Sequence, residues 1–143
     1  MATYNKYNQF LLDMARGVHN LTSFPATAGT LVVALSNTAG DADATKATLS
    51  QITQSSYTNL SSRVIQGGTA TQTNGTLHVA ATDWAGTASG GTVGTFRYVI
   101  LYNDVPTSPA DPLICWYDYG SNVTLQDGET FTIDFATDIF TAV

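Results

Sequence analysis

The stretch Phe96-Arg97-Tyr98-Val99-Ile100-Leu101-Tyr102 is apolar at six of its seven positions, and it decides the fold class. A second run of this kind, Leu-Ile-Cys-Trp-Tyr at residues 113–117, follows a turn rich in Asn, Asp and Pro. A strand that carries apolar side chains on both faces must be covered on both faces. The two runs therefore predict the central strands of a sheet.

Toward the C-terminus, apolar and polar residues alternate in a pattern that predicts a hairpin. Apolar side chains stand at positions 123 and 125, and again at 131, 133 and 135. Between them lies Asp127-Gly128, a dipeptide that favours a tight two-residue turn. One face of the hairpin is expected to be buried, and the other is expected to face water.

The remaining strand signals complete an all-β pattern. Asn74-Gly75 predicts another hairpin, because both positions of a two-residue turn require positive φ. Residues 86–94 are rich in Gly, and no separate element is predicted there. Further strands are predicted at 31–35, 63–66, 69–73, 76–81 and 139–140. About eight or nine short strands without an internal repeat favour an antiparallel β-sandwich, jelly-roll-like, in a single domain over residues 1–143.

One N-terminal amphipathic helix is predicted over about residues 4–21. Its apolar stripe either packs on the protein's own sheet, which we favour, or docks on a neighbouring subunit. The stripe consists of Tyr4, Tyr7, Leu11, Met14, Val18 and Leu21. Residues 37–62 are mostly small and polar, and they are predicted to form a long loop that carries contacts, with a short helical turn at 47–51.

Charge is scarce and unevenly distributed: 11% of the residues are charged, and the net charge is −6. Residues 1–97 carry five bases and four acids, whereas residues 98–143 carry seven acids and no base. Nucleic acid and anionic membrane surfaces attract basic proteins, so neither is expected as a partner. We expect the helix-bearing part to face a protein partner and the acidic hairpins to face water.

The start of the chain lacks the basic segment and apolar run of a secretory signal, and no stretch is apolar for long enough to cross a membrane. Cys115 is the single cysteine, so no internal disulfide can form. We therefore expect the protein to be made in a reducing cytoplasm.

No constellation for catalysis or metal binding is visible in the sequence. His19 and His78 are both predicted to be ordinary surface residues, and Cys115 is predicted to be a buried, unreactive thiol. The spacing of zinc ligands is absent, and Asp41 and Asp43 make only a fragment of a calcium loop. The sequence predicts no enzyme activity, no cofactor and no metal.

Two aromatic residues are predicted to be exposed, because they stand beside Gly and Asp residues. These are Trp84 and Tyr119. Exposed aromatic rings can stack on sugars or anchor a protein interface. The aromatic residues of the two apolar runs are instead predicted to fill the core.

Five segments of the chain resemble small structural proteins of tailed bacteriophages, and together they cover most of its length. Their sequences are NQFLLDMARGVH (8–19), TLVVALSNT (30–38), DWAGTASGGTVGTFRY (83–98), DPLICWYDYGS (111–121) and LQDGETFTIDF (125–135). Proteins of this kind and size are commonly capsid decoration, or cement, proteins. The resemblance lies in the overall pattern of these segments.

The resemblance implies a non-enzymatic virion protein, made in the bacterial host cytoplasm, that binds the outside of the head shell and stabilises it. Its partners would be the major capsid protein and further copies of itself, as a dimer or trimer. Contacts are expected through residues 1–21 and the 37–62 loop, and removal of residues 1–21 is expected to abolish shell binding without unfolding the domain. The expected contact residues are Tyr4, Lys6, Tyr7, Arg16, Asp41, Asp43, Trp84 and Tyr119.

The alternative function is a receptor- or glycan-binding module of a tail fibre or head fibre. In that case Trp84 and Tyr119 would be the platforms on which sugar rings stack.

Overall fold

The computed structural model describes residues 3–24 and 30–143. It is 48% strand and 10% helix. The elements are β1 (Tyr4–Lys6), α1 (Asn8–Ala15), β2 (Ser23–Phe24), β3 (Leu31–Ser36), η1 (Ala39–Asp41), η2 (Leu49–Gln51), β4 (Gly68–Thr73), β5 (Thr76–Ala80), β6 (Trp84–Thr87), β7 (Val93–Asn103), β8 (Leu113–Leu125), β9 (Thr130–Ile133) and β10 (Phe140–Ala142). The ten strands of the described residues pair antiparallel, so the all-β prediction is confirmed.

The two apolar runs form the middle of the largest sheet, as predicted. Its strand order is β1-β8-β7-β3, with Ile100 opposite Trp116 in the central pair. Val99 and Leu101 point into the main core, whereas Ile100 points into a second apolar cluster on the other face of the sheet. Both faces of the sheet are therefore covered, as the unbroken apolar sequence requires.

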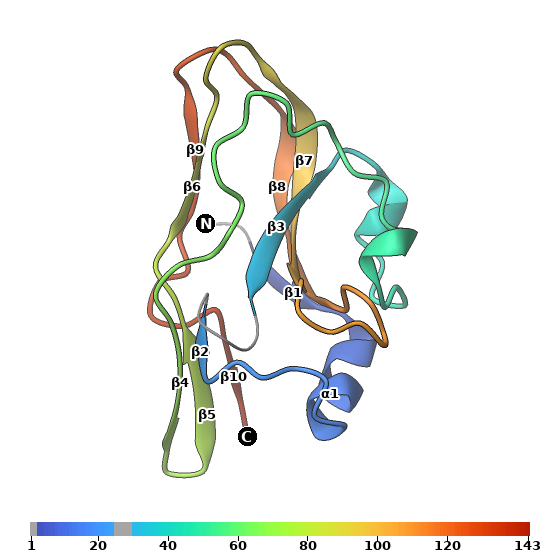
Figure 1. The fold of residues 1–143 in the computed structure, drawn as a ribbon, viewed down its shortest axis with the longest axis vertical. Coiled ribbons are helices and arrows are strands. Elements are labelled where there is room, and N and C mark those ends of the chain that lie inside the picture. Colours follow the sequence, from blue (N-terminus) through green and yellow to red (C-terminus); the bar gives the residue numbers. More distant parts are fainter. Residues whose placement is uncertain (1–2, 25–29) are drawn as a thin grey trace.

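Two smaller sheets form the second layer. The sheets β10-β5-β4-β2 and β6-β9 lie end to end along the long axis of the molecule (Figure 1). Side chains from both layers meet in the main core, among them Leu101 from the large sheet, Val79 from β5 and Phe131 from β9. The architecture is sandwich-like, in agreement with the predicted fold class.

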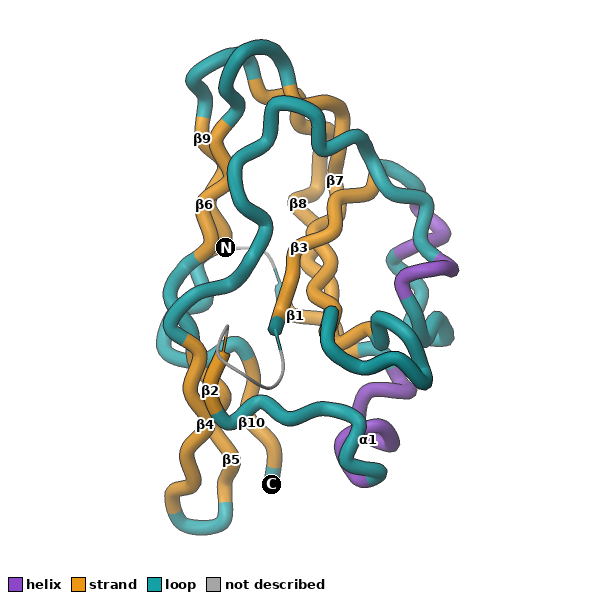
Figure 2. Tube along the Cα trace, viewed as in Figure 1, coloured by secondary structure: helices purple, strands orange, loops and turns teal. Residues whose placement is uncertain are grey.

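Residues 39–52 of the predicted 37–62 loop cover the outer face of the large sheet, whereas Tyr57 and Leu60 farther along pack against the main core. Figure 2 shows η1 and η2 in this segment, on the side of the sheet away from the smaller sheets. Ile52 joins the outer apolar cluster, and Leu49 packs against it. The backbone is tied down as well, because Leu113 N donates to Ala47 O at 2.9 Å. The helical turn predicted at 47–51 is present as η2.

The N-terminal helix is shorter than predicted. Residues 4–6 form β1, which pairs with β8 so that Tyr4 lies opposite Tyr117, and the helix covers only Asn8–Ala15. Gly17, just beyond the helix C-cap Arg16, has a φ of +75°, a left-handed conformation that glycine adopts without strain and that terminates the helix. The predicted stripe was wrong in part, because Leu11 is exposed while Phe10 is fully buried.

The predicted C-terminal hairpin was wrong in its strand pairing. The turn is present, since Glu129 N donates to Gln126 O at 2.9 Å. However, β8 pairs with β7 and β9 pairs with β6, so the turn joins strands of different layers. Alternation shows which face of a strand is buried, but it does not identify the neighbouring strand.

The other strand predictions have mixed outcomes. The Asn74-Gly75 hairpin is confirmed, with φ values of 50° and 84° at the two turn positions. Residues 63–66 make only an isolated bridge, Val64 to Val32. Residues 84–87 form β6, although no separate element was predicted for the Gly-rich stretch that begins at residue 86.

Candidate functional site

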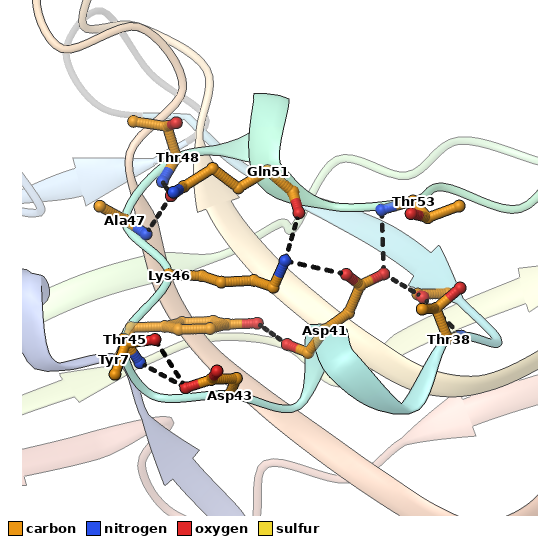
Figure 3. Close-up of polar contacts among 11 residues, drawn as sticks. Tyr7, Thr38, Asp41, Asp43, Thr45, Lys46, Ala47, Thr48, Gln51 and Thr53 are labelled. Atoms are coloured by element: carbon orange, nitrogen blue, oxygen red, sulfur yellow. Dashed lines mark hydrogen bonds and ion pairs between the residues drawn. The ribbon is translucent and has the colours of Figure 1, made fainter.

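Asp41, a predicted contact residue, is 1% exposed, and both of its carboxylate oxygens are occupied inside the protein, so it is not free to bind a partner. Its Oδ2 accepts hydrogen bonds from Ser36 Oγ at 2.5 Å and from Thr53 N at 2.9 Å. Lys46 Nζ lies 3.5 Å from Oδ1 and also donates to Gln51 O at 2.6 Å (Figure 3). This network holds the 39–52 cover against β3, so the role of Asp41 is structural.

Tyr7 and Asp43 flank this network and differ in exposure. Tyr7 is fully buried, and its hydroxyl donates to Asp41 O at 3.0 Å. Asp43 is exposed, and its carboxylate accepts hydrogen bonds from the backbone and the hydroxyl of Thr45. These hydrogen bonds lower the pKa of Asp43. Of the two predicted contact residues, only Asp43 is accessible.

Three large apolar side chains of α1 and the 103–112 turn are exposed. Leu11 is 48% exposed, Leu12 44% and Val105 48%. Helix α1 and the turn are neighbours on the side of the molecule away from β6 and β9 (Figure 1). Arg16, a predicted contact residue, is exposed at the end of the helix. We call Leu11, Leu12, Arg16 and Val105 the helix-end surface.

Two further predicted contact residues lie on β1. Lys6 is half-buried, and it forms no ion pair within the described ranges. Tyr4 packs against the main core, and its ring stacks on Phe140 at a centroid distance of 6.3 Å. Tyr4 is therefore mainly a core residue, whereas Lys6 is partly accessible at the sheet edge.

A cavity of about 540 Å³ opens between α1, the start of η2 and the 103–112 turn. The residues that line it are Gln9, Asp13, Arg16, Val18, Ala47, Thr48, Ser108 and Pro109. Asp13 is 1% exposed. The helical pattern of the sequence does not reveal Asp13 as a cavity residue, because the predicted stripe places position 13 on the polar face of the helix.

A second cleft, of about 420 Å³, surrounds Tyr119. This residue is 55% exposed, as predicted, and its ring meets Phe131 edge-on at 5.3 Å. Asp118, Thr132 and Asp134 also line the cleft. We call Tyr119, Phe131, Asp118, Thr132 and Asp134 the Tyr119 cleft.

A bidentate ion pair fixes one wall of the Tyr119 cleft. Arg97 Nε and Nη2 donate to the two carboxylate oxygens of Asp118 at 2.7 and 2.9 Å. Arg97 lowers the pKa of Asp118, so that carboxylate stays charged as an acceptor. The cleft thus combines an exposed aromatic ring with charged and hydroxyl groups.

Trp84 was predicted to be exposed, and this prediction was wrong. It is 4% exposed and belongs to the main core. Its Nε1 donates to Ser62 O at 3.0 Å, so the indole is satisfied inside the protein. Trp84 stands on β6, and the alternation that would have revealed its burial is interrupted by Gly86.

The predicted surface position of His19 was also wrong, whereas the predictions for His78 and Cys115 fit the structure better. His19 is 7% exposed, and its Nδ1 lies 3.2 Å from Asn103 Nδ2. Burial lowers the pKa of His19 to about 4. His78 is half-buried and pairs with Asp138 at 2.9 Å. Cys115 is fully buried, and burial raises the pKa of its thiol.

Over residues 3–24 and 30–143, no three His, Cys, Asp or Glu side chains come together as a metal-binding group. In the same ranges no helix is long and apolar enough to cross a membrane. The acids of the C-terminal turn region, Asp127, Glu129 and Asp134, are exposed as predicted, but two other acids lie on the side of the helix. The turn that carries Asp104 and Asp111 lies beside α1, and burial, followed by the charge of Asp104, raises the pKa of Asp111.

Comparison with known proteins identifies no relative: no family model, curated protein or solved structure matches the chain.

Proposed function

We propose that the chain is a non-enzymatic structural protein of a tailed bacteriophage that decorates the outside of the head shell and stabilises it. The observation that carries the proposal is the helix-end surface, where Leu11, Leu12 and Val105 are each more than two-fifths exposed. Large apolar side chains that stay exposed on neighbouring elements are candidates for protein interaction sites. The resemblance of five segments to phage structural proteins supplies the proposed partner, the major capsid protein.

The rest of the molecule is compatible with this role. A decoration protein needs a rigid body that presents one docking surface, and both faces of the large sheet are covered by apolar packing. We propose further that the protein acts as a dimer or trimer on the capsid exterior, after synthesis in the host cytoplasm. Closed symmetric oligomers of this kind let one surface contact several shell subunits.

The test is the binding of purified protein to empty heads of a phage that encodes it, measured by co-sedimentation. The Leu11→Asp/Leu12→Asp double variant is expected to bind at least tenfold more weakly while unfolding at the same temperature, because both side chains are exposed. Tyr119→Ala is the matched control and should bind normally. Normal binding by a folded double variant would refute the proposed surface.

A second candidate, a glycan-binding module, is favoured by the Tyr119 cleft. Sugar recognition uses an exposed aromatic ring for stacking, together with carboxylates and hydroxyls that bond to the sugar hydroxyls. Trp84 is buried, so it is no longer a candidate platform for sugar stacking. A glycan array separates the two functions: saturable binding that is lost in Tyr119→Ala and retained in the double leucine variant would favour the fibre module.

A further inference from the structure

Asp13, one of the residues that line the cavity beside α1, is a buried carboxylate with one unpartnered oxygen. Asp13 is 1% exposed, and Gln9 Nε2 donates to its Oδ1 at 2.9 Å. Its Oδ2 has no hydrogen-bond partner in the part of the chain that the structure describes. Burial of an unpaired carboxylate is costly, so such an atom marks a place where a cation would be strongly favoured.

The cavity walls suit an organic cation with an alkyl stem. Val18, Ala47 and Pro109 provide apolar surface, on which methylene groups can lie. Thr48 and Ser108 also line the cavity, and both residues carry oxygens of the kind that accept hydrogen bonds from N–H groups. A metal ion fits less well, since no group of three metal-ligating side chains occurs among residues 3–24 and 30–143.

We propose that this cavity is a socket for the guanidinium or ammonium head of an arginine or lysine side chain carried by a partner protein, with Asp13 as the counter-charge. A protein source is favoured because Leu11 and Leu12 on α1 and Val105 on the neighbouring turn are exposed apolar side chains. A free small amine would leave these side chains uncovered. Asp13 is the counter-charge in this socket whichever protein carries the arginine or lysine side chain.

Two neighbouring groups bear on the charge of the socket. His19 is neutral at physiological pH, because burial lowers its pKa to about 4, so it adds no opposing positive charge. Arg16 lines the cavity three residues after Asp13, and its side chain forms no ion pair within the described ranges. Arg16 is therefore the chain's own competitor for Asp13, and Arg16→Gln removes it.

The experiment titrates the natural chain and the Arg16→Gln variant with Nα-acetyl-arginine amide and Nα-acetyl-lysine amide at neutral pH. Backbone amide shifts of α1 and the 103–112 turn are followed by NMR. The citrulline amide has nearly the same shape as the arginine amide but no charge, so it is expected to bind at least tenfold more weakly. Asp13→Asn is expected to weaken binding of the arginine amide at least tenfold, whereas Asp43→Asn, the control outside the cavity, should leave it unchanged.

Several results would overturn the proposal. These are equal affinity for the citrulline and arginine amides, undiminished affinity in a folded Asp13→Asn variant, or no saturable binding to either the natural chain or Arg16→Gln. Tighter binding of free putrescine than of both amides would overturn the protein source. The citrulline comparison uses the unaltered chain, so the test stays decisive if Asp13→Asn fails to fold.

Discussion

Burial of His19 links the stability of the fold to pH. The imidazole is 7% exposed and packs edge-on against Phe10 at 5.2 Å. Burial lowers its pKa to about 4, and the charge of Asp13 opposes this shift more weakly. The unfolded chain takes up this proton near its ordinary pKa of about 6.5. Stability should therefore be complete above that value and fall as the pH decreases toward 4.

The expected loss from His19 is about 3 kcal/mol of unfolding free energy at pH 4. Urea unfolding of the natural chain and of His19→Gln, measured between pH 7 and pH 4, isolates it, because other groups titrate in both proteins. The natural chain should lose more stability than the variant over this range. Parallel pH profiles of the natural chain and His19→Gln would refute the assignment. His78→Gln is the control: it retains His19, so it should lose more stability between pH 7 and pH 4 than His19→Gln does.

Asp41 is expected to be far more important for stability than Asp43, although the two stand in the same segment. Asp41→Ala removes the acceptor of Ser36 and Thr53 and leaves these groups unpaired, at a cost of about 3 kcal/mol. Asp43→Ala alters an exposed carboxylate and should leave the unfolding midpoint little changed. Urea unfolding of both variants checks this, and equal losses would contradict the role given to the Asp41 network.

Residue patterns in the sequence did not separate buried from exposed polar groups. The sequence predicts both Asp41 and Asp43 as accessible acids of a loop. In the folded chain Ser36 and Thr53 donate hydrogen bonds to Asp41, and the sequence pattern does not show these contacts. Asp13 lies on the polar side of the predicted stripe, so helical periodicity alone does not show that the fold buries it. Tyr119 was predicted correctly because its neighbours are polar and small, a local signal.

Among the elements, the Asn74-Gly75 hairpin offers a direct test of backbone strain. Gly75 has φ +84°, so Gly75→Ala should lower the unfolding free energy by about 1 kcal/mol. Gly40→Ala is the matched control, because no atom lies within 4 Å of the added methyl group and φ there is not positive. Thermal unfolding measures both variants, and equal destabilisation would contradict the strain explanation.

Element predictions succeeded where one local signal determines the structure and failed where a distant strand competes. The runs at 96–102 and 113–117 and the Asn74-Gly75 hairpin are determined by their own residues. Residues 4–6 follow the helical periodicity of the sequence, but they pair with the edge of β8 and form the strand β1. The strand after Asp127-Gly128 pairs with β6 and not with β8, and the alternation of apolar and polar residues does not specify the pairing partner.

For the whole molecule, the fold class was predictable because composition and strand count limit an all-β chain to few architectures. The arrangement of surfaces was not predictable. Residues 39–52 cover the outer face of the large sheet, and the acidic 103–112 turn lies beside α1 (Figure 1). Both facts depend on how distant segments pack, so the sequence could name candidate contact residues but could not place them on one surface.

Removal of residues 1–21 is expected to unfold the protein, contrary to the sequence-based expectation. The segment contributes β1 and the buried side chains of Tyr7, Phe10 and Leu21. Loss of these three side chains alone removes about 6 kcal/mol of apolar burial, comparable with the whole stability of a typical domain. The truncated chain should lose its near-UV circular dichroism and its cooperative thermal transition. Leu11→Ser/Leu12→Ser, which alters only exposed side chains of the same segment, should retain both, and a cooperative transition in the truncated chain would show that the N-terminal segment is not part of the core.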